Sequence, residues 1–193
     1  MTKPEEAMMT DEIQTSRLVL RPYRDADAVV LTRLINDPRI YRNVGRIPPG
    51  QPVEETRRIQ RERAVANAAG KSAGFCAYLG DELVGMAGGG ESPDTGLIDF
   101  GYWIAPDHWG KGFATEAGAA VLHWFVHNQE RREMTAGYFP DNPGSGRVLE
   151  KLGFRKSGES RYFCLGREME VDCIEMYWPA SADVFNAYLQ DTP

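Results

Sequence analysis

A glycine turn between a buried strand and a helix constrains this chain more than any other feature of its sequence. Residues 97–104 (LIDFGYWI) are apolar on both faces of a strand except at Asp99, which indicates a central strand of a sheet covered on both sides. Pro106 ends this strand, and from Phe113 onward apolar residues recur at helical spacing, which predicts a helix packed on the sheet. Only the short turn around Gly110 and Gly112 joins the two elements.

Such a turn is suited to hold an anion. Glycines let the backbone approach a ligand closely, and the unpaired amides and positive dipole end of the helix favour negative charge. We therefore expect a phosphate or pyrophosphate to bind there. The residues expected to contact it are Trp109, Gly110, Lys111, Gly112, Phe113, Ala114 and Thr115.

Two common nucleotide-binding motifs do not fit this turn. A Walker loop needs a glycine before its Gly-Lys pair and Ser or Thr directly after it, but Ala105 and Gly112 occupy those positions. The dinucleotide pattern G-x-G-x-x-G fails because Thr115 stands in place of its third glycine. These departures count against a nucleotide-binding protein, but that function is kept as a possibility beside those named below.

Strand and helix patterns follow one another along the rest of the chain. The run of glycines from Gly88 to Gly90 is expected to be a flexible strand exit. The predicted strands are 16–23, 72–79, 83–87, 97–104, 134–139, 162–164 and 171–178, and the predicted helices are 25–36, 53–69, 145–152 and one starting at Phe113.

The length of 193 residues fits one domain. We expect a mobile tail over residues 1–12, the folded domain over 13–178, and an extension over 179–193 with a short helix from Ser181. Lys and Arg number 22 against 28 Asp and Glu, a net charge of −6, which argues against nucleic acid or an anionic membrane as partner. No stretch resembles a membrane span or a targeting signal, so a cytoplasmic location is expected.

The potential metal ligands form no recognisable site in the sequence. Cys76, Cys164 and Cys173 lack a C-x-x-C pair, which supports neither a disulfide framework nor a zinc ribbon. His123 and His127 lie four residues apart on one predicted helix, but the residues between them lack the Glu of a zinc-protease motif. We expect no metal.

An ordered set of motifs resembles one enzyme family. The turn fits the pattern Gln/Arg-x-x-Gly-x-Gly/Ala through Gly112 and Ala114, and it is flanked by 13–23 (IQTSRLVLRPY), 142–145 (NPGS) and 147–154 (RVLEKLGF). Together these segments resemble the GNAT superfamily of acetyl-CoA-dependent N-acetyltransferases, in particular its ribosomal-protein N-terminal acetyltransferase (RimJ/RimL-like) branch. The resemblance covers Ile13 to Trp178. Trp109 departs from it, because the family has Gln or Arg at this position.

The resemblance implies the α/β fold of acyl-CoA N-acyltransferases, a mixed and mostly antiparallel central sheet with helices on both faces. It implies that the parallel strands 97–104 and 134–139 splay apart, with the pantetheine arm of acetyl-CoA between them. Free backbone groups near Ile104 and Ala105 should pair with that arm. Asn142 and Ser145 match positions at which the family contacts CoA, so acetyl-CoA is the expected cosubstrate.

The resemblance also suggests two catalytic residues. Asp99 matches the position where many members carry a general-base Glu, and its shorter side chain would act through a water; the alternative is an Asp that only fixes a loop. Ser145 matches a serine near the CoA sulfur that would protonate the departing thiolate; the alternative is simple helix capping. Leu149 stands where many relatives carry a proton-donating Tyr, so Tyr138 or solvent is the next candidate acid if Ser145 is only a cap.

These features together predict an acetyl-CoA-dependent N-acetyltransferase that acts directly on a primary amine, as a monomer or homodimer. A catalytically weak CoA-binding regulatory or interaction module is the alternative. The sequence carries no code for the acceptor, so protein N-termini, amino acids, polyamines and antibiotics all remain open.

Overall fold

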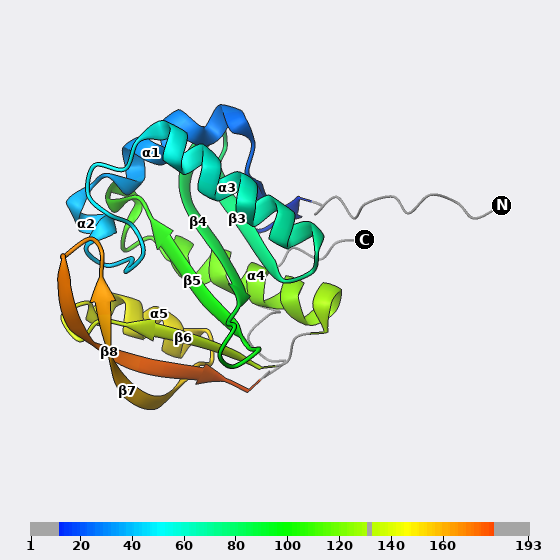
Figure 1. Cartoon of the computed structure of the whole chain (residues 1–193). Helices are drawn as coiled ribbons and strands as arrows, with labels where there is room; N and C mark the ends of the chain where they lie inside the picture. The colour runs from blue at the N-terminus through cyan, green and yellow to red at the C-terminus, as the bar shows by residue number, and fades with distance from the viewer. Residues whose placement is uncertain (1–11, 131–132, 180–193) are drawn as a thin grey trace.

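One eight-stranded sheet runs through the structure (Figure 1). The computed structural model describes residues 12–130 and 133–179. The strands are β1 (Ile13–Gln14), β2 (Val19–Pro22), β3 (Ser72–Leu79), β4 (Glu82–Glu91), β5 (Ile98–Ile104), β6 (Met134–Tyr138), β7 (Arg155–Cys164) and β8 (Met169–Trp178). The helices are α1 (Ala28–Ile35), α2 (Pro38–Tyr41), α3 (Val53–Ala68), α4 (Phe113–Gln129) and α5 (Pro143–Lys151), with short 3-10 turns at Asp25–Asp27 and Pro106–His108.

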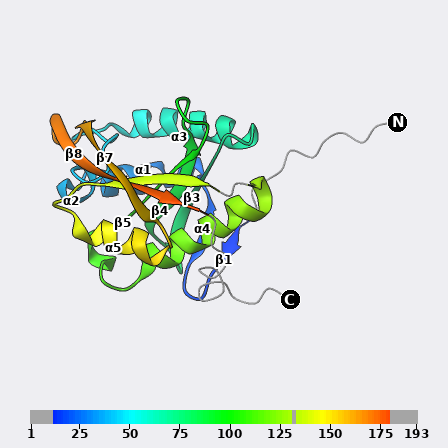
Figure 2. The same cartoon turned by 90° about the horizontal axis from the view of Figure 1, so that it is seen from below.

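The strand order is β1-β2-β3-β4-β5-β6-β8-β7, and β5 with β6 is its parallel pair. The other neighbouring pairs are antiparallel. Helices α1 and α3 lie on one face of the sheet and α4 and α5 on the other, as Figure 2 shows. The predicted mixed, mostly antiparallel sheet with helices on both faces is confirmed. The predicted N-terminal tail, apart from Glu12, and the predicted helix from Ser181 lie outside the described residues.

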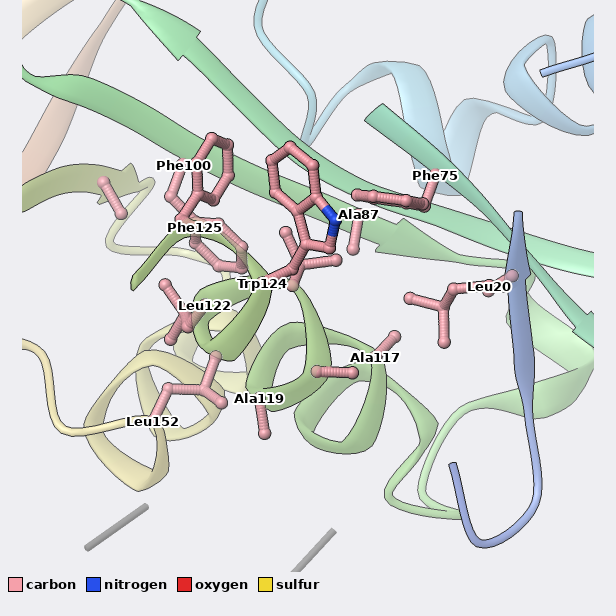
Figure 3. Close-up of a cluster of buried hydrophobic side chains, with 14 of the residues drawn as sticks. Leu20, Phe75, Ala87, Phe100, Ala117, Ala119, Leu122, Trp124, Phe125 and Leu152 are labelled. Carbon is pink, nitrogen blue, oxygen red and sulfur yellow. The ribbon is translucent and has the colours of Figure 1, made fainter. Parts of the chain in front are cut away.

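Helix α4 is apolar around most of its circumference because it is packed on nearly every side. Its residues Ala117 to Leu122 are all buried, as expected for a helix enclosed by other elements. Trp124 meets Phe75 of β3 edge to face, with ring centroids 5.5 Å apart, and Figure 3 shows these rings among the aliphatic side chains of the main core. This packing holds α4 against the central strands of the sheet.

Helix α3 is polar, and its exposed side is lined by ion pairs. Arg58 pairs with Glu55 and Glu62 at 2.7 and 2.5 Å, and Arg61 pairs with Asp25. Such exposed pairs contribute little stability each. The helix therefore depends on its inner side, where Thr56 is buried.

The glycine run is not a flexible exit, and that prediction was wrong. Gly88 and Gly89 lie inside β4, paired on both sides with β3 and β5. A Cβ on Gly88 would lie 2.3 Å from the carbonyl oxygen of Ala73, and one on Gly89 would lie 2.6 Å from Cγ2 of Ile98. The glycines are present because neighbouring strands approach too closely for a side chain.

The last hairpin is longer than the sequence indicates. β7 begins at Arg155, seven residues before the predicted Tyr162, with a register shift between Lys156 and Gly158. Polar residues dominate the first half of this strand, so its alternation of apolar residues is weak. The hairpin forms one edge of the sheet and extends toward the loop after α2 (Figure 1).

Candidate active site

The parallel strands β5 and β6 separate almost as soon as they meet. They pair only at Ile98 with Met134 and Asp99 with Thr135 among the described residues, although β5 continues to Ile104. β6 instead stays paired with β8 along its whole length. The predicted splay is therefore confirmed. Beyond Asp99, β5 is therefore not paired with β6 on this side in the described part of the chain, and the start of α5 lies next to the separated strands.

The glycine turn lies at the open end of this splay. Gly110 and Gly112 have φ angles of 74° and 83°, in the left-handed region that favours glycine. Gly112 is the N-cap of α4, and a Cβ on Gly110 would meet nothing within 4 Å. The first amides of a helix have no acceptor within it, so the turn has the backbone freedom and the donors to hold an anion.

The segment between β1 and β2 braces this turn, which the sequence analysis did not foresee. Arg17 donates from Nη1 to the carbonyl oxygen of Lys111 at 2.8 Å and from Nε to Glu116 at 2.7 Å. Its guanidinium lies 4.6 Å from the centre of the Phe113 ring. A sequence separation of 94 residues between Arg17 and Lys111 hides this contact from any local pattern.

The backbone groups at the end of β5 are not free, and this part of the expectation was wrong. The Ala105 amide donates to the carbonyl oxygen of Val84 at 2.7 Å, because the β4 ladder continues past the last strand residue. The Ile104 carbonyl oxygen accepts from Nε1 of Trp109 at 2.6 Å. A carbonyl has a second lone pair, so Ile104 can still accept from a ligand.

The start of α5 faces β5 across the splay. Asn142 caps the helix, its side-chain oxygen accepting from the Ser145 amide at 3.3 Å. The Ser145 hydroxyl lies 2.9 Å from the hydroxyl of Tyr102, which also donates to the Ser145 carbonyl oxygen at 3.0 Å. Burial raises the pKa of Tyr102 to about 12, opposed by its hydrogen bond to Ser145. Tyr102 therefore stays protonated near neutral pH.

Tyr102 was not singled out from the sequence, although a polar tip in a buried strand is a usable signal. Leu149 is buried in the main core, which agrees with its inability to serve a reacting group. Tyr138 packs against Gly146, where a Cβ would lie 2.7 Å from its ring. Of the two tyrosines, Tyr102 is the one whose hydroxyl contacts Ser145.

Asp99 lies where the strands part, on the sheet face opposite α4, because its neighbours Ile98 and Phe100 belong to the core beneath that helix. Its side chain is 44% exposed and lies 3.3 Å from Nη2 of Arg46. Loss of hydration raises the pKa of Asp99, the charge of Arg46 lowers it, and the charge of Glu175 raises it. The net shift is upward, toward the range useful for a base.

The loop after α2 and the β7–β8 hairpin meet beside Asp99. The Leu165 amide donates to the Gly45 carbonyl oxygen at 2.8 Å, and Nε of Arg167 donates to the Arg42 carbonyl oxygen at 2.6 Å. A cavity of about 410 Å³ runs along the hairpin, lined by Pro140, Glu159, Ser160, Arg161, Asp172, Cys173 and Ile174. Neither Arg46 nor Glu175 was foreseen, because both reach Asp99 from distant segments.

Within residues 12–130 and 133–179, no group of three or more His, Cys, Asp or Glu side chains is arranged to hold a metal ion. His123 and His127 stack at 3.8 Å between ring centroids. No helix in these two ranges is long and apolar enough to span a bilayer.

A family model described as an acetyltransferase (GNAT) domain matches residues 17–155. This range includes the glycine turn, the splayed strands and the start of α5. The chain belongs to the GNAT acetyltransferase family. It is therefore an N-acetyltransferase of the GNAT type, as its motifs predict.

Curated relatives carry the same activity in their names. The uncharacterized N-acetyltransferase p20 of Bacillus licheniformis is 28% identical over 166 residues, covering 83% of this chain and 93% of that protein. The [Ribosomal protein uS5]-alanine N-acetyltransferase of Escherichia coli is 27% identical over 166 residues, covering 79% of this chain and 82% of the relative. The GNAT family is thus supported over most of the domain.

Solved structures share the fold. RimL, described as a ribosomal L7/L12 alpha-N-protein acetyltransferase in complex with coenzyme A, superposes with a TM-score of 0.76 at 17% identity, over 90% of this chain and 100% of that one. RimJ of Mycobacterium smegmatis, in complex with CoA-disulfide, has a TM-score of 0.76 at 24% identity, over 88% of each chain. Both of these proteins bind a form of CoA.

Proposed function

We propose that this protein transfers the acetyl group of acetyl-CoA directly to a primary amine, with both substrates bound at the same time. The observation that carries the proposal is the separation of β5 from β6 directly after Asp99. The gap lies between an anion-binding turn on one side and a capped helix start on the other. An acyl donor on the α4 side of the sheet can reach an amine on the Asp99 side through it.

The donor site fits acetyl-CoA. The pyrophosphate is assigned to the turn from Trp109 to Thr115, where the left-handed glycines leave the backbone open. The pantetheine arm is assigned to the gap, with the second lone pair of the Ile104 carbonyl as an acceptor for one of its amides. Asn142 and Ser145 then lie toward the thioester end. The Ala105 amide is left out of this assignment because Val84 already accepts from it.

Asp99 is assigned the role of general base. A primary amine arrives as an ammonium ion and must lose a proton before it can attack. Asp99 accepts this proton through a water, and the neutral nitrogen then attacks the thioester carbonyl. The C–N bond forms, the C–S bond breaks, and the electrons of the C–S bond leave on the sulfur as a thiolate.

Ser145 is assigned the role of acid toward that thiolate. Its hydroxyl gives a proton to the sulfur, and the hydroxyl of Tyr102, 2.9 Å away, can return one. Because burial keeps Tyr102 protonated, it serves as the proton source behind Ser145. The new amide nitrogen gives its surplus proton to solvent water, from which Tyr102 recovers the proton it has given up. The products are the amide and free CoA.

The acceptor is assigned to the Asp99 side of the sheet. Asp99 and Glu175 place negative charge on that side, and Arg46 offsets part of it. Burial raises the pKa of Cys173, and the charges of Glu175 and Asp99 raise it further. Such a field favours a cationic amine. The alanine N-acetyltransferase acting on ribosomal protein uS5 makes a protein N-terminus the first candidate, with small-molecule amines as the second.

A coupled assay of thiol release tests the proposal. Acetyl-CoA is mixed with the protein and a panel that includes peptides with free N-termini, the same peptides with blocked N-termini, amino acids and polyamines. Thiol release that occurs only when a free amine is present supports acetyl transfer. CoA binding without release from any amine would favour the catalytically weak module, and a preference for ATP over CoA in thermal-shift measurements would favour a nucleotide-binding protein.

If an amine is accepted, acetylation of a cell extract with labelled acetyl-CoA identifies the natural acceptor. Label on the N-terminus of a protein supports the first candidate. Label confined to small molecules supports the second.

A further inference from the structure

Arg17 connects the N-terminal strand segment to the glycine turn through several defined contacts. Its Nη1 donates to the Lys111 carbonyl oxygen at 2.8 Å, and its Nη2 lies 2.6 Å from Oε2 of Glu116. The guanidinium also covers the Phe113 ring. Three successive parts of the turn and helix start are thus held by one side chain.

Glu116 keeps Arg17 in this position. Its side chain is 2% exposed and accepts from the Thr15 hydroxyl at 2.7 Å and from the Arg17 amide at 2.8 Å. A buried carboxylate needs such partners because an unpaired charge is costly away from water. The Arg17 side chain, although 45% exposed, is therefore fixed at both its backbone and its guanidinium.

The contact with Lys111 has a consequence for the next residue. The peptide unit is planar and trans here, so the Lys111 carbonyl and the Gly112 amide point in opposite directions. Because Arg17 holds the carbonyl on its own side, the Gly112 amide is directed away from Arg17. In a turn of left-handed glycines this peptide can otherwise rotate easily.

Arg17 also places positive charge next to the turn. A Cβ on Gly112 would lie 3.3 Å from Nη2 of Arg17, so the guanidinium is in direct reach of this residue. It offsets the negative charge of Glu116, which lies in the first turn of α4 and would otherwise repel an anion. Both effects act on the same part of the turn.

We propose that Arg17 is a positioning residue for the donor pyrophosphate, acting by orienting the Lys111–Gly112 peptide and by neutralising Glu116. This inference rests on the proposed use of acetyl-CoA. It assigns to the segment before β2 a direct part in donor affinity. Arg17 has no part in the proton transfers assigned to Asp99 and Ser145.

The test compares two acyl donors in the Arg17→Gln variant. Acetyl-CoA carries the pyrophosphate, whereas S-acetylpantetheine has the same thioester arm without it. We expect the KM for acetyl-CoA and the Kd for CoA to rise roughly 10- to 100-fold, with kcat little changed. The kcat/KM for S-acetylpantetheine should stay within about twofold of wild type. Arg58→Gln, which breaks an exposed Arg–Glu pair on α3, is the matched control and should leave both donors unaffected.

Equal losses of kcat/KM for acetyl-CoA and S-acetylpantetheine would overturn the proposal, because Arg17 would then only stabilise the fold. Unchanged CoA affinity in a folded variant would overturn it as well. If Arg17→Gln does not fold, Arg17→Lys is used instead, because it keeps the charge but lacks the guanidinium that contacts Lys111 and Glu116 at the same time. It should show the same selective rise in KM for acetyl-CoA, but a smaller one. Failure of the wild-type protein to bind CoA would instead reject the proposed function, so the two failures are distinguishable.

Discussion

The indole of Trp109 donates a hydrogen bond from Nε1 to the carbonyl oxygen of Ile104 at 2.6 Å. Trp109 occupies the motif position at which the family has Gln or Arg. The bond ties the glycine turn back to the last residue of β5, while Trp109 as a whole stays 51% exposed. The residue that departs from the family pattern thus supplies its own link between the glycine turn and the splayed strand.

Removing this donor should weaken CoA binding. Trp109→Phe keeps an aromatic ring but cannot donate, and we expect the Kd for CoA to rise roughly 2- to 10-fold. Trp109→Arg restores a donor and adds positive charge, so its affinity should equal or exceed that of wild type. Calorimetry measures both. A loss of the same size in the two variants would show that the indole bond is not the reason for the effect.

A side chain at Gly112 should abolish donor binding. Gly112 has a φ of 83°, which strains any other residue, and Gly112→Asp adds a negative charge where the pyrophosphate is assigned. We expect no measurable CoA binding by calorimetry. Gly70→Asp is the control, because Gly70 also has a left-handed φ of 70° but lies on the opposite side of the sheet, after α3. Near-normal affinity in a folded Gly112→Asp variant would reject the turn as the anion site.

The sequence predicted the fold well where patterns are local. The apolar strand 97–104, the turn and α4 follow one another in the chain, so their order and packing could be inferred from periodicity. The splay was predicted only through the family resemblance. The glycine run at Gly88 was misjudged because its cause is the close approach of Ala73 and Ile98, which no single-strand pattern contains.

Site residues within the motifs were easier to predict than those that act on them. Asp99 stands out because it is the acid in an otherwise apolar strand, whereas Ser145 was found through the family resemblance. Arg17, Arg46 and Glu175 do not, since each meets its partner only after distant segments have packed. The Ala105 amide was expected to be free, but the β4 ladder takes it up, and the extent of that ladder cannot be inferred from either strand alone.

The pH dependence of turnover should report on Asp99. As a base it works in the deprotonated form, so kcat/KM should fall as the pH drops through its pKa. Arg46 lowers this pKa and Glu175 raises it. Arg46→Gln should therefore move the acidic limb of the profile to higher pH, and Glu175→Gln should move it to lower pH. Opposite displacements identify Asp99 as the titrating group.

The variant Asp99→Asn measures how much Asp99 contributes to turnover as a general base. It should lower kcat by about 10²- to 10⁴-fold with CoA affinity unchanged, and the acidic limb should disappear. A loss of only a few-fold at the optimum would demote Asp99 to a residue that fixes the loop through Arg46. An acidic limb that stays in place in the Asn variant would point to another base.

The last prediction separates an acid from a helix cap at Ser145. Ser145→Ala should reduce kcat by about 10- to 100-fold with little change in CoA affinity, because Asn142 still caps α5 through the Ser145 amide. Tyr102→Phe removes the proton source behind Ser145 and should give a smaller loss. Both defects should shrink with acyl donors whose leaving thiol has a lower pKa, since that thiol needs less protonation. Weaker CoA binding with normal kcat in Ser145→Ala would make the residue a cofactor contact.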